Sequence, residues 1–154
     1  LEQMPAADQR PLIALDGITN PQNLGMIIRS ITASPAHGLL LPSKGCADIG
    51  PLVIKASAGT LFKGNILRCD SLASTLKAFK QKGFEICTLS SHQATPLSEF
   101  KPRAPVIYVL GNETEGVSKE IAALSDHRVG IPMANGVESL NVAITAALIA
   151  FKSL

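Results

Sequence analysis

The sequence predicts an α/β fold in which a mostly parallel sheet is covered by helices. Short and continuously apolar segments recur along the chain, and the segments between them carry apolar residues at helical spacing. Continuous apolar strands are typical of parallel sheets that are buried on both faces. Glycine, proline and asparagine separate these segments at regular points. The alternation of β and α segments therefore indicates a sheet with helices packed on it.

The composition is that of one compact domain. The chain has 154 residues, of which 46% are hydrophobic and 17% are charged, so it can bury a substantial core. The formal charge of +2 neither requires nor excludes nucleic acid. Apolar runs stay shorter than the ~20 residues of a membrane span, and the first residues do not resemble a signal peptide. We expect a cytoplasmic protein with no membrane partner.

The cysteines and histidines are scattered along the chain. They stand at Cys46, Cys69 and Cys87 and at His37, His92 and His127. An odd number of distant cysteines in apolar surroundings suits buried thiols in a reducing compartment better than a disulfide framework. Without a CxxC or HExxH pattern, we expect no metal site.

The first part of the chain is predicted to be β-α-β. Residues 1–10 are polar and are expected to form a linker or tail ahead of a domain over residues 11–154, and residues 11–16 are an apolar strand. Asn23 is placed to cap the following helix, whose apolar residues have helical spacing. The next strand, residues 38–41, ends before a proline, which cannot donate to a sheet ladder.

The middle of the chain continues the alternation. A short helix is expected over residues 52–58, before a glycine, and a strand over residues 65–69. Ser71 is suited to cap the next helix, which has apolar residues on one face and lysines on the other. A strand at residues 84–89 follows, and residues 90–103 are polar with two prolines, which indicates a loop.

The last third has the clearest strand signal. Residues 106–110 are predicted to be a buried strand, residues 111–116 a loop, and residues 118–124 a short helix. A final strand is expected at residues 128–131 and a final apolar helix over residues 139–152. Ligands of parallel sheets bind at the carboxyl ends of the strands. We therefore expect the site to be built from the loops that follow Asp16, Leu89, Leu110 and Ile131.

The first polar motif of interest contains Asn23 and Arg29. The two residues are six positions apart and so do not stack on one helical face. A capping asparagine with a solvated arginine is the somewhat favoured interpretation of these residues alone. Arg29 nevertheless lies in an otherwise apolar helix, where an arginine is either paired or available for a phosphate or carboxylate.

The second motif is a polar loop between Gly111 and Gly116. Its spacing resembles a P-loop, but Val117 stands where the phosphate-binding lysine is required. Glu113 and Glu115 would repel a triphosphate, so a cationic or zwitterionic ligand suits the loop better. A tight βα turn with solvated acids is about as good an interpretation of this motif when it is taken alone.

The third motif covers residues 131–142. A proline and an Asn-Gly pair indicate a tight loop, and an apolar helix follows. Ser139 and Asn141 are expected in the first turn of this helix, where capping accounts for one of them but not for both. Glu138 is favourable beside a helix N-terminus and needs no further role.

Taken in this order, the three motifs resemble the SpoU/TrmH branch of the SPOUT superfamily, whose members methylate ribose 2′-hydroxyls of RNA with S-adenosylmethionine. The similar segments are Asn-Pro-Gln-Asn-Leu-Gly…Arg at 20–29, Leu-Gly-Asn-Glu-x-x-Gly at 110–116 and Ile-Pro-Met…Gly-Val-Glu-Ser-Leu-Asn-Val at 131–142. Ala-Ser-Ala-Gly at 56–59 is also similar. The likeness extends over residues 12–150, and Thr114 departs from the small residue that is common there.

The resemblance implies a deep trefoil knot in the C-terminal part, a homodimer, and a tRNA or rRNA substrate. The residues that it implies for cofactor binding are Leu89, Leu110, Gly111, Asn112, Ile131, Met133 and Leu140. The residues that it implies for catalysis are Arg29, Asn23, Glu113, Ser139 and Asn141. Because arginine does not lose its proton in proteins, we favour a phosphate-assisted role for Arg29. We also expect the chain to be a fragment that lacks an N-terminal RNA-binding domain.

Two alternatives remain beside this interpretation. One is an RNA-binding SPOUT-like protein without activity, against which the presence of Arg29, Glu113, Ser139 and Asn141 argues. The other is a flavodoxin-like nucleotide-binding protein, against which the failed P-loop and the third motif argue.

Overall fold

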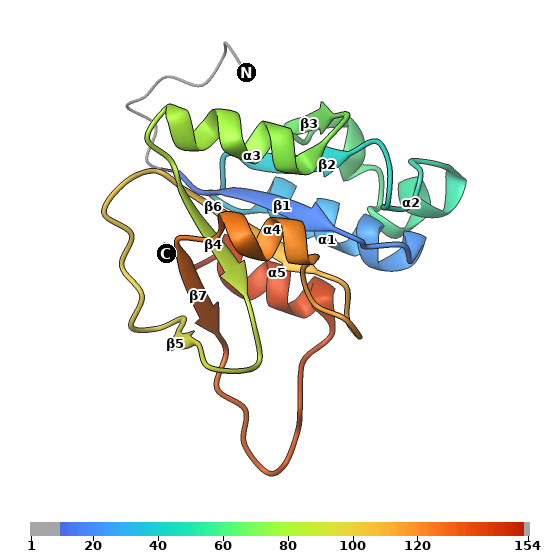
Figure 1. Ribbon diagram of the computed structural model, residues 1–154. Helices are drawn as coiled ribbons and strands as arrows, with labels where there is room; N and C mark the ends of the chain where they lie inside the picture. The colour runs from blue at the N-terminus through green and yellow to red at the C-terminus, as the bar shows by residue number, and fades with distance from the viewer. Residues whose placement is uncertain (1–9, 153–154) are drawn as a thin grey trace.

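The structure is a computed structural model that describes residues 10–152. The elements follow one another in an almost regular alternation of strands and helices (Figure 1). In chain order they are β1 (Leu12–Asp16), α1 (Pro21–Ala33), β2 (Gly38–Pro42), α2 (Pro51–Ala56), a 3₁₀ turn (Thr60–Phe62), β3 (Ile66–Cys69), α3 (Leu72–Gln81), β4 (Glu85–Leu89), β5 (Thr95–Pro96), β6 (Val106–Gly111), α4 (Lys119–Leu124), β7 (His127–Gly130) and α5 (Val142–Ala150).

The strands form one seven-stranded sheet in the order β3-β2-β1-β6-β4-β7-β5. Every pairing between neighbouring strands is parallel. Asp16 lies beside Gly111, and Leu89 lies beside Val129, so the carboxyl ends of the central strands meet at one edge. The prediction of a parallel α/β fold is confirmed.

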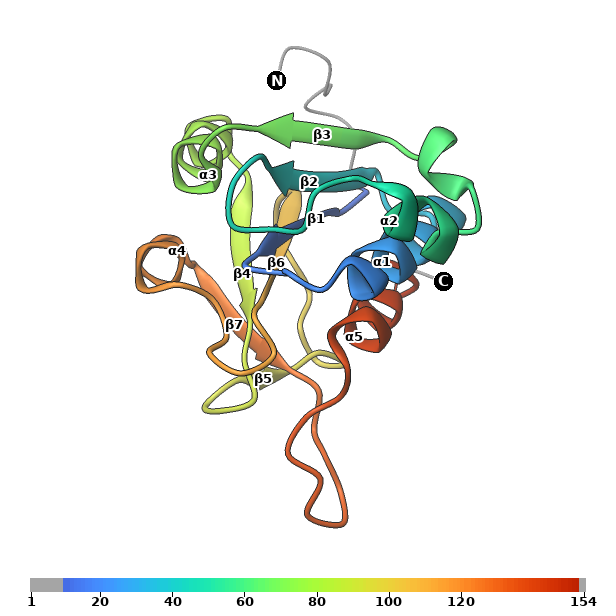
Figure 2. The same cartoon turned by 90° about the vertical axis from the view of Figure 1, so that its right-hand side faces the viewer.

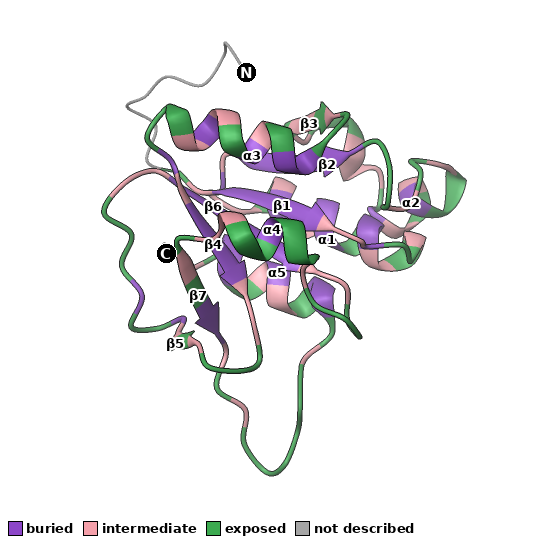
Figure 3. Cartoon of the chain, viewed as in Figure 1, coloured by how far each residue is buried: buried purple, intermediate pink, exposed green. Residues whose placement is uncertain are grey.

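Side chains of each strand alternate between two apolar layers. In β1, Ile13 and Leu15 contact the layer of α1, α2 and α5, whereas Leu12 and Ala14 contact the layer of α3 and α4. Figure 2 shows these layers on the two sides of the sheet. The central strands are buried on both faces (Figure 3). This double burial explains why their sequences are continuously apolar.

Helix α1 is held closely between α2 and α5. A side chain at Gly25 would place its Cβ 2.5 Å from the Cβ of Ala56, so only glycine permits this approach of α1 to α2. On its other side α1 lies beside α5 (Figure 2). The first turn of α1 is thereby fixed next to the start of α5, although the two segments are far apart in the sequence.

Some predicted boundaries are wrong. Helix α1 begins at Pro21 and is capped by Asn20, not by Asn23. The expected loop at residues 90–103 contains the short strand β5, which pairs with β7. Strand β7 ends at Gly130, one residue earlier than expected, and α5 begins only at Val142.

Other expectations concern the N-terminal tail, the knot, the domain limits and membrane association. All but the last residue of the predicted tail at 1–10 lies outside the described part. The trefoil knot and the extent of the domain stay predictions. None of the helices described is both long and apolar enough to cross a membrane.

Candidate functional site

A cavity of about 660 Å³ opens at the carboxyl ends of β4, β6 and β7. Its volume is within the range of roughly 300–1,000 Å³ that is usual for small-molecule sites. All seven residues expected to bind a cofactor line it, namely Leu89, Leu110, Gly111, Asn112, Ile131, Met133 and Leu140. The structure therefore brings together three loops that the sequence separates, at the edge of the sheet where ligands are expected.

The loop after β6 is a tight turn. The backbone of Asn112 exchanges hydrogen bonds with that of Gly116, at 2.9 and 2.8 Å. A Cβ on Gly111 would lie 2.1 Å from the carbonyl carbon of Gly116, so the turn has no room for a side chain there. The Asn112 side chain donates to the carbonyl of Gly17 at 3.1 Å. The turn interpretation is thus correct, and the same turn also forms a wall of the cavity.

The loop between β7 and α5 projects from the body of the molecule (Figures 1 and 2). Its tip is a turn in which Asn135 and Gly136 have positive φ, and Val137 donates to the carbonyl of Ala134. Ser139 lies in this loop and not in the first helical turn, so that expectation is wrong. Ser139 lines the cavity and is exposed.

Asn141 is the residue that caps α5. Its side-chain oxygen accepts a hydrogen bond from the backbone N–H of Ala143 at 2.8 Å. The preceding residues stay outside the helix because their backbone forms the cavity loop. Capping therefore uses the oxygen of the Asn141 amide and leaves its nitrogen available, and Ser139 does not cap the helix.

A chain of hydrogen bonds joins the three motifs. Asn23 donates to a carboxylate oxygen of Glu113 at 2.7 Å and accepts a hydrogen bond from the side chain of Asn141 at 3.1 Å. Asn20 supplies the cap of α1 by accepting from the backbone N–H groups of Gln22 and Asn23. Because Asn20 caps the helix, the side chain of Asn23 is free to connect the other two motifs.

The hydrogen bonds fix the orientation of both amides. The amide nitrogen of Asn23 faces a carboxylate, which only accepts, and its oxygen faces the amide nitrogen of Asn141. The oxygen of Asn141 in turn faces a backbone N–H. Reversing either amide would oppose two donors or two acceptors. The three side chains therefore form one ordered group at the mouth of the cavity.

Arg29, like Ser139, is a predicted catalytic residue outside this hydrogen-bonded group. It is exposed on α1 and does not line the cavity. Within residues 10–152 it takes part in no hydrogen bond or ion pair. Its guanidinium therefore has all its donors available to a ligand, as one of the two interpretations of Arg29 requires.

Asp16, at the end of β1, has a structural role. Its carboxylate accepts a hydrogen bond of 2.7 Å from the backbone N–H of Ser118, at the start of α4. The side chain of Ser118 forms no cap of its own. The acid at the end of β1 thus holds the start of a helix.

Several cavity residues were not anticipated from the sequence. They are Thr88, Ser90, His92, Ala122, Arg128 and Thr145, among others. Arg128 precedes the end of β7 by two residues, and its position near the carboxyl edge of a central strand is the signal that could have identified it.

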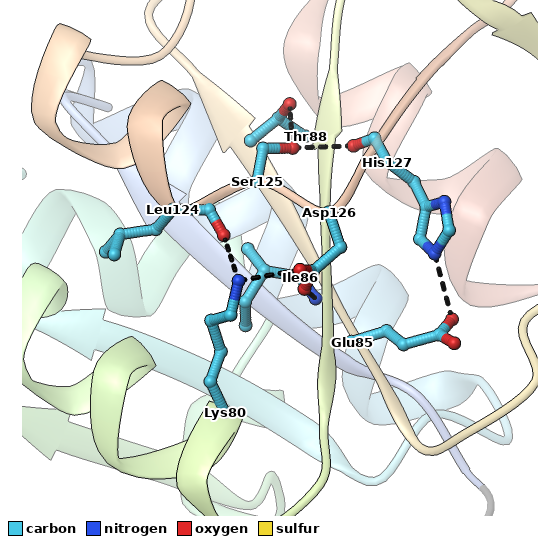
Figure 4. A network of polar contacts seen from close by, with 8 residues as sticks. All are labelled: Lys80, Glu85, Ile86, Thr88, Leu124, Ser125, Asp126 and His127. Carbon is cyan, nitrogen blue, oxygen red and sulfur yellow. Dashed lines mark hydrogen bonds and ion pairs between the residues drawn. The ribbon is translucent and has the colours of Figure 1, made fainter.

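A polar network supports the wall formed by β4 and β7 (Figure 4). Lys80 on α3 forms an ion pair of 2.6 Å with Asp126, whose other oxygen accepts from the backbone N–H of Ile86 at 2.8 Å. The hydroxyl groups of Ser125 and Thr88 form a hydrogen bond of 2.8 Å. Burial raises the pKa of the Asp126 carboxyl. The hydrogen bond from Ile86 and the ion pair with Lys80 lower this pKa by more than burial raises it, so it lies below its usual value. This network fixes the turn from α4 into β7.

The thiols are poorly suited to nucleophilic chemistry. Burial raises the pKa of Cys46 and of Cys69, and it raises that of Cys87 to about 12. Each is therefore a neutral thiol at physiological pH. Within residues 10–152, no group of three or more His, Cys, Asp or Glu side chains lies close enough together to hold a metal ion.

Comparison with known proteins places these features in context. The sequence model of the SpoU rRNA Methylase family matches residues 10–151. A tRNA/rRNA methyltransferase of Mycolicibacterium smegmatis, described as uncharacterized, is 36% identical over 145 residues, which are 93% of this chain and 46% of that protein. The chain thus spans about half the length of the curated relatives that it matches.

Solved structures show the same fold. The SpoU methyltransferase AviRb from Streptomyces viridochromogenes, in complex with AdoMet, superposes with a TM-score of 0.87 at 30% identity, over 99% of this chain and 62% of that one. An RNA 2′-O ribose methyltransferase superposes with a TM-score of 0.85 at 28% identity, over 99% of this chain and 58% of that one.

Proposed function

Because this chain belongs to the SpoU rRNA methylase family, we propose that it transfers a methyl group from S-adenosylmethionine to a ribose 2′-hydroxyl of tRNA or rRNA. The observation that carries this proposal is the hydrogen-bonded group of Asn23, Glu113 and Asn141 at the mouth of the cavity. It adjoins a pocket of suitable size that is lined by the residues expected to bind the cofactor. The match to a solved 2′-O ribose methyltransferase supports the choice of the ribose.

The cavity fits S-adenosylmethionine by size and charge. Leu89, Leu110, Ile131 and Leu140 offer apolar side chains and backbone groups to the adenosine. Glu113 carries negative charge toward a ligand whose sulfonium and ammonium groups are positive. When bound, the cofactor supplies a methyl group that is already activated, so the protein need only position the acceptor and assist the loss of its proton.

The polar residues then have distinct tasks. A ribose hydroxyl is a weak nucleophile at neutral pH, and it must approach in a fixed direction. The ordered amides of Asn23 and Asn141, together with Glu113 and Ser139, shape the place where the ribose enters. Arg29 binds a neighbouring phosphate with its free guanidinium and holds it beside the ribose hydroxyl, where a phosphate oxygen accepts the proton that the hydroxyl releases as it takes the methyl group.

The protein acts as a homodimer in this proposal. Helix α5 is apolar around its whole circumference, which is characteristic of a helix covered on all sides. Yet Ile144 and Leu148 are 50% and 46% exposed, and Met26 on the adjacent α1 is 44% exposed. A second copy that covers this face would bury these side chains beside the site. The reaction takes place in the cytoplasm, with part of the RNA selection supplied by the second copy or by further sequence.

The test is methyl transfer from tritiated S-adenosylmethionine to total RNA, followed by nucleoside mapping. We expect the label in 2′-O-methylated nucleosides, which make the adjoining phosphodiester resistant to alkali. Label in a nucleobase would contradict the ribose as the target. Incorporation of label by an Asn23→Ala variant gives the background. If the wild-type chain binds the cofactor but incorporates no label, the inactive RNA-binding alternative is favoured.

A further inference from the structure

We propose that Arg128 binds the carboxylate at the amino-acid end of the cofactor. This inference rests on the proposed function and adds a residue to its cofactor site. Arg128 lies on β7 and lines the cavity. Its neighbour Val129 is buried in the apolar layer of α1 and α5. Because side chains alternate along a strand, Arg128 faces the layer of α4.

The side chain of Arg128 is available to a ligand. It is exposed, and in the described part of the chain it forms no hydrogen bond or ion pair. Thr88 on β4 is paired with Arg128 in the sheet and also lines the cavity. The Thr88 hydroxyl, however, is hydrogen-bonded to the Ser125 hydroxyl. The guanidinium N–H donors of Arg128 therefore have no hydrogen-bond partner among the described residues of this wall.

The charges in the cavity indicate which group Arg128 binds. Glu113, Glu115 and Glu138 line the cavity, and Arg128 is its sole lysine or arginine among the residues described. S-adenosylmethionine has two cationic groups and one carboxylate. The acids suit the cations, and an arginine fork matches the geometry of a carboxylate through two parallel hydrogen bonds.

The sulfur of S-adenosylmethionine carries three groups, namely the methyl group, the adenosine and the amino-acid chain. The position of Arg128 is consistent with a separate place for each of them. The hydrogen-bonded group of Asn23 and Asn141 lies where α1 and α5 begin, so the methyl group must point toward that side. The apolar loops accommodate the adenosine. Arg128 lies on the opposite side of the sheet, with Ala122 of α4, and there it can receive the remaining arm.

An RNA phosphate is the other anion that Arg128 could bind. Three carboxylates in the same cavity disfavour a phosphate, which carries a full negative charge without a compensating ammonium. The amino-acid arm of the cofactor carries both signs of charge and suits this mixed lining better.

The experiment compares ligands that differ only in the carboxylate. Isothermal titration measures the affinities of the wild-type chain and of Arg128→Gln for S-adenosylmethionine and for its decarboxylated form. We expect Arg128→Gln to weaken S-adenosylmethionine binding by roughly 10- to 100-fold, as for loss of a charge-assisted hydrogen bond, and to leave the decarboxylated form unchanged. The affinity of Arg128→Lys for S-adenosylmethionine should lie between those of the wild type and Arg128→Gln, since lysine keeps the positive charge but cannot form two parallel hydrogen bonds.

The controls separate the inference from the proposed function. Arg103→Gln, which changes an exposed arginine outside the cavity, should bind both ligands as the wild type does. Equal affinity of Arg128→Gln and wild type for S-adenosylmethionine would overturn the role of Arg128 alone. A raised KM for RNA with unchanged cofactor affinity would assign Arg128 to RNA instead. A wild-type chain that binds neither ligand would overturn the proposed function, and the inference with it.

Discussion

Asn23 donates a hydrogen bond of 2.7 Å to Glu113, a residue 90 positions later in the chain. Asn141 donates to the oxygen of the same Asn23 amide. One side chain in the first turn of α1 thus connects the loops that follow β6 and β7. Its amide geometry sets the relative position of groups that no single loop could place.

Replacing Asn23 with alanine should reduce methyl transfer far more than cofactor binding. The change removes both hydrogen bonds, so Glu113 loses its partner and Asn141 is held only by its capping bond to Ala143. A small displacement of positioning groups costs about 100-fold in rate. Cofactor affinity should change less than about threefold, because Asn23 does not line the cavity. Single-turnover rates and isothermal titration measure the two effects. Gln81→Ala, an exposed change on α3, is the control.

Replacing Arg29 with alanine should abolish methyl transfer while S-adenosylmethionine still binds. Arg29 lies outside the cavity, so its loss leaves the cofactor contacts intact. Because Arg29 is proposed to hold the phosphate beside the reacting ribose, we expect a rate at least about 100-fold lower. Arg68→Ala, on the edge strand β3, should retain the wild-type rate. Parallel loss of cofactor affinity and rate in Arg29→Ala would show that the residue is structural.

Replacing Gly111 with alanine should destabilise the chain by distorting the turn that follows β6. The added Cβ would meet the backbone of Gly116, which cannot turn aside as a flexible side chain can. We expect the free energy of unfolding in urea to fall by about 1–3 kcal/mol. Gly50→Ala has no atom within 4 Å of the added Cβ and should cost less than about 1 kcal/mol, from the changed cap of α2. Equal losses in both variants would contradict the steric account.

A charged face on α5 should separate the proposed dimer. Ile144→Glu with Leu148→Glu places two carboxylates where the second copy would bury apolar side chains. Light scattering after size exclusion should give the dimer mass for the wild type and the monomer mass for the double variant. Leu52→Glu, at an even more exposed position on α2, should stay dimeric. A monomeric wild type at micromolar concentration would contradict the proposal.

Asp126 should stabilise the chain at neutral pH but not in strong acid. Its pKa is lowered in the folded chain, so its contribution is present above the pKa of the unfolded state and is lost as the pH falls through the folded pKa. Asp126→Asn should therefore unfold more easily by about 1 kcal/mol at pH 7, since the ion pair is partly exposed. Urea unfolding at several pH values should show this difference disappearing below about pH 4. A difference that persists at low pH would mean that packing, not charge, is responsible.

The sheet and its helices could be predicted because their signals are local and repeated. Residues 106–110 are apolar without interruption since both faces of β6 are buried. The carboxyl-edge location of the site followed from parallel strands alone. The seven residues expected to bind the cofactor came from the resemblance, and the structure places all of them around one cavity.

The errors arose where two residues compete for one local role. Asn20 and Asn23 are both suitable caps, and Pro21, which favours the first helical position, decides for Asn20. Ser139 precedes an apolar segment that looks helical, but the cavity loop extends through it to Asn141. Strand β5 has two residues and depends wholly on its pairing with β7, so it has no local signal.

The bond between Asn141 and Asn23 spans 118 positions, which sets when the site can form during synthesis. Chains emerge from the ribosome with their N-terminal part first, so β1, α1 and β2 can associate early. The ordered group at the cavity mouth has to wait until Asn141 has left the exit tunnel. A nascent chain that stalls before this point carries the first two motifs without the third, and its Asn23 lacks the hydrogen bond from Asn141.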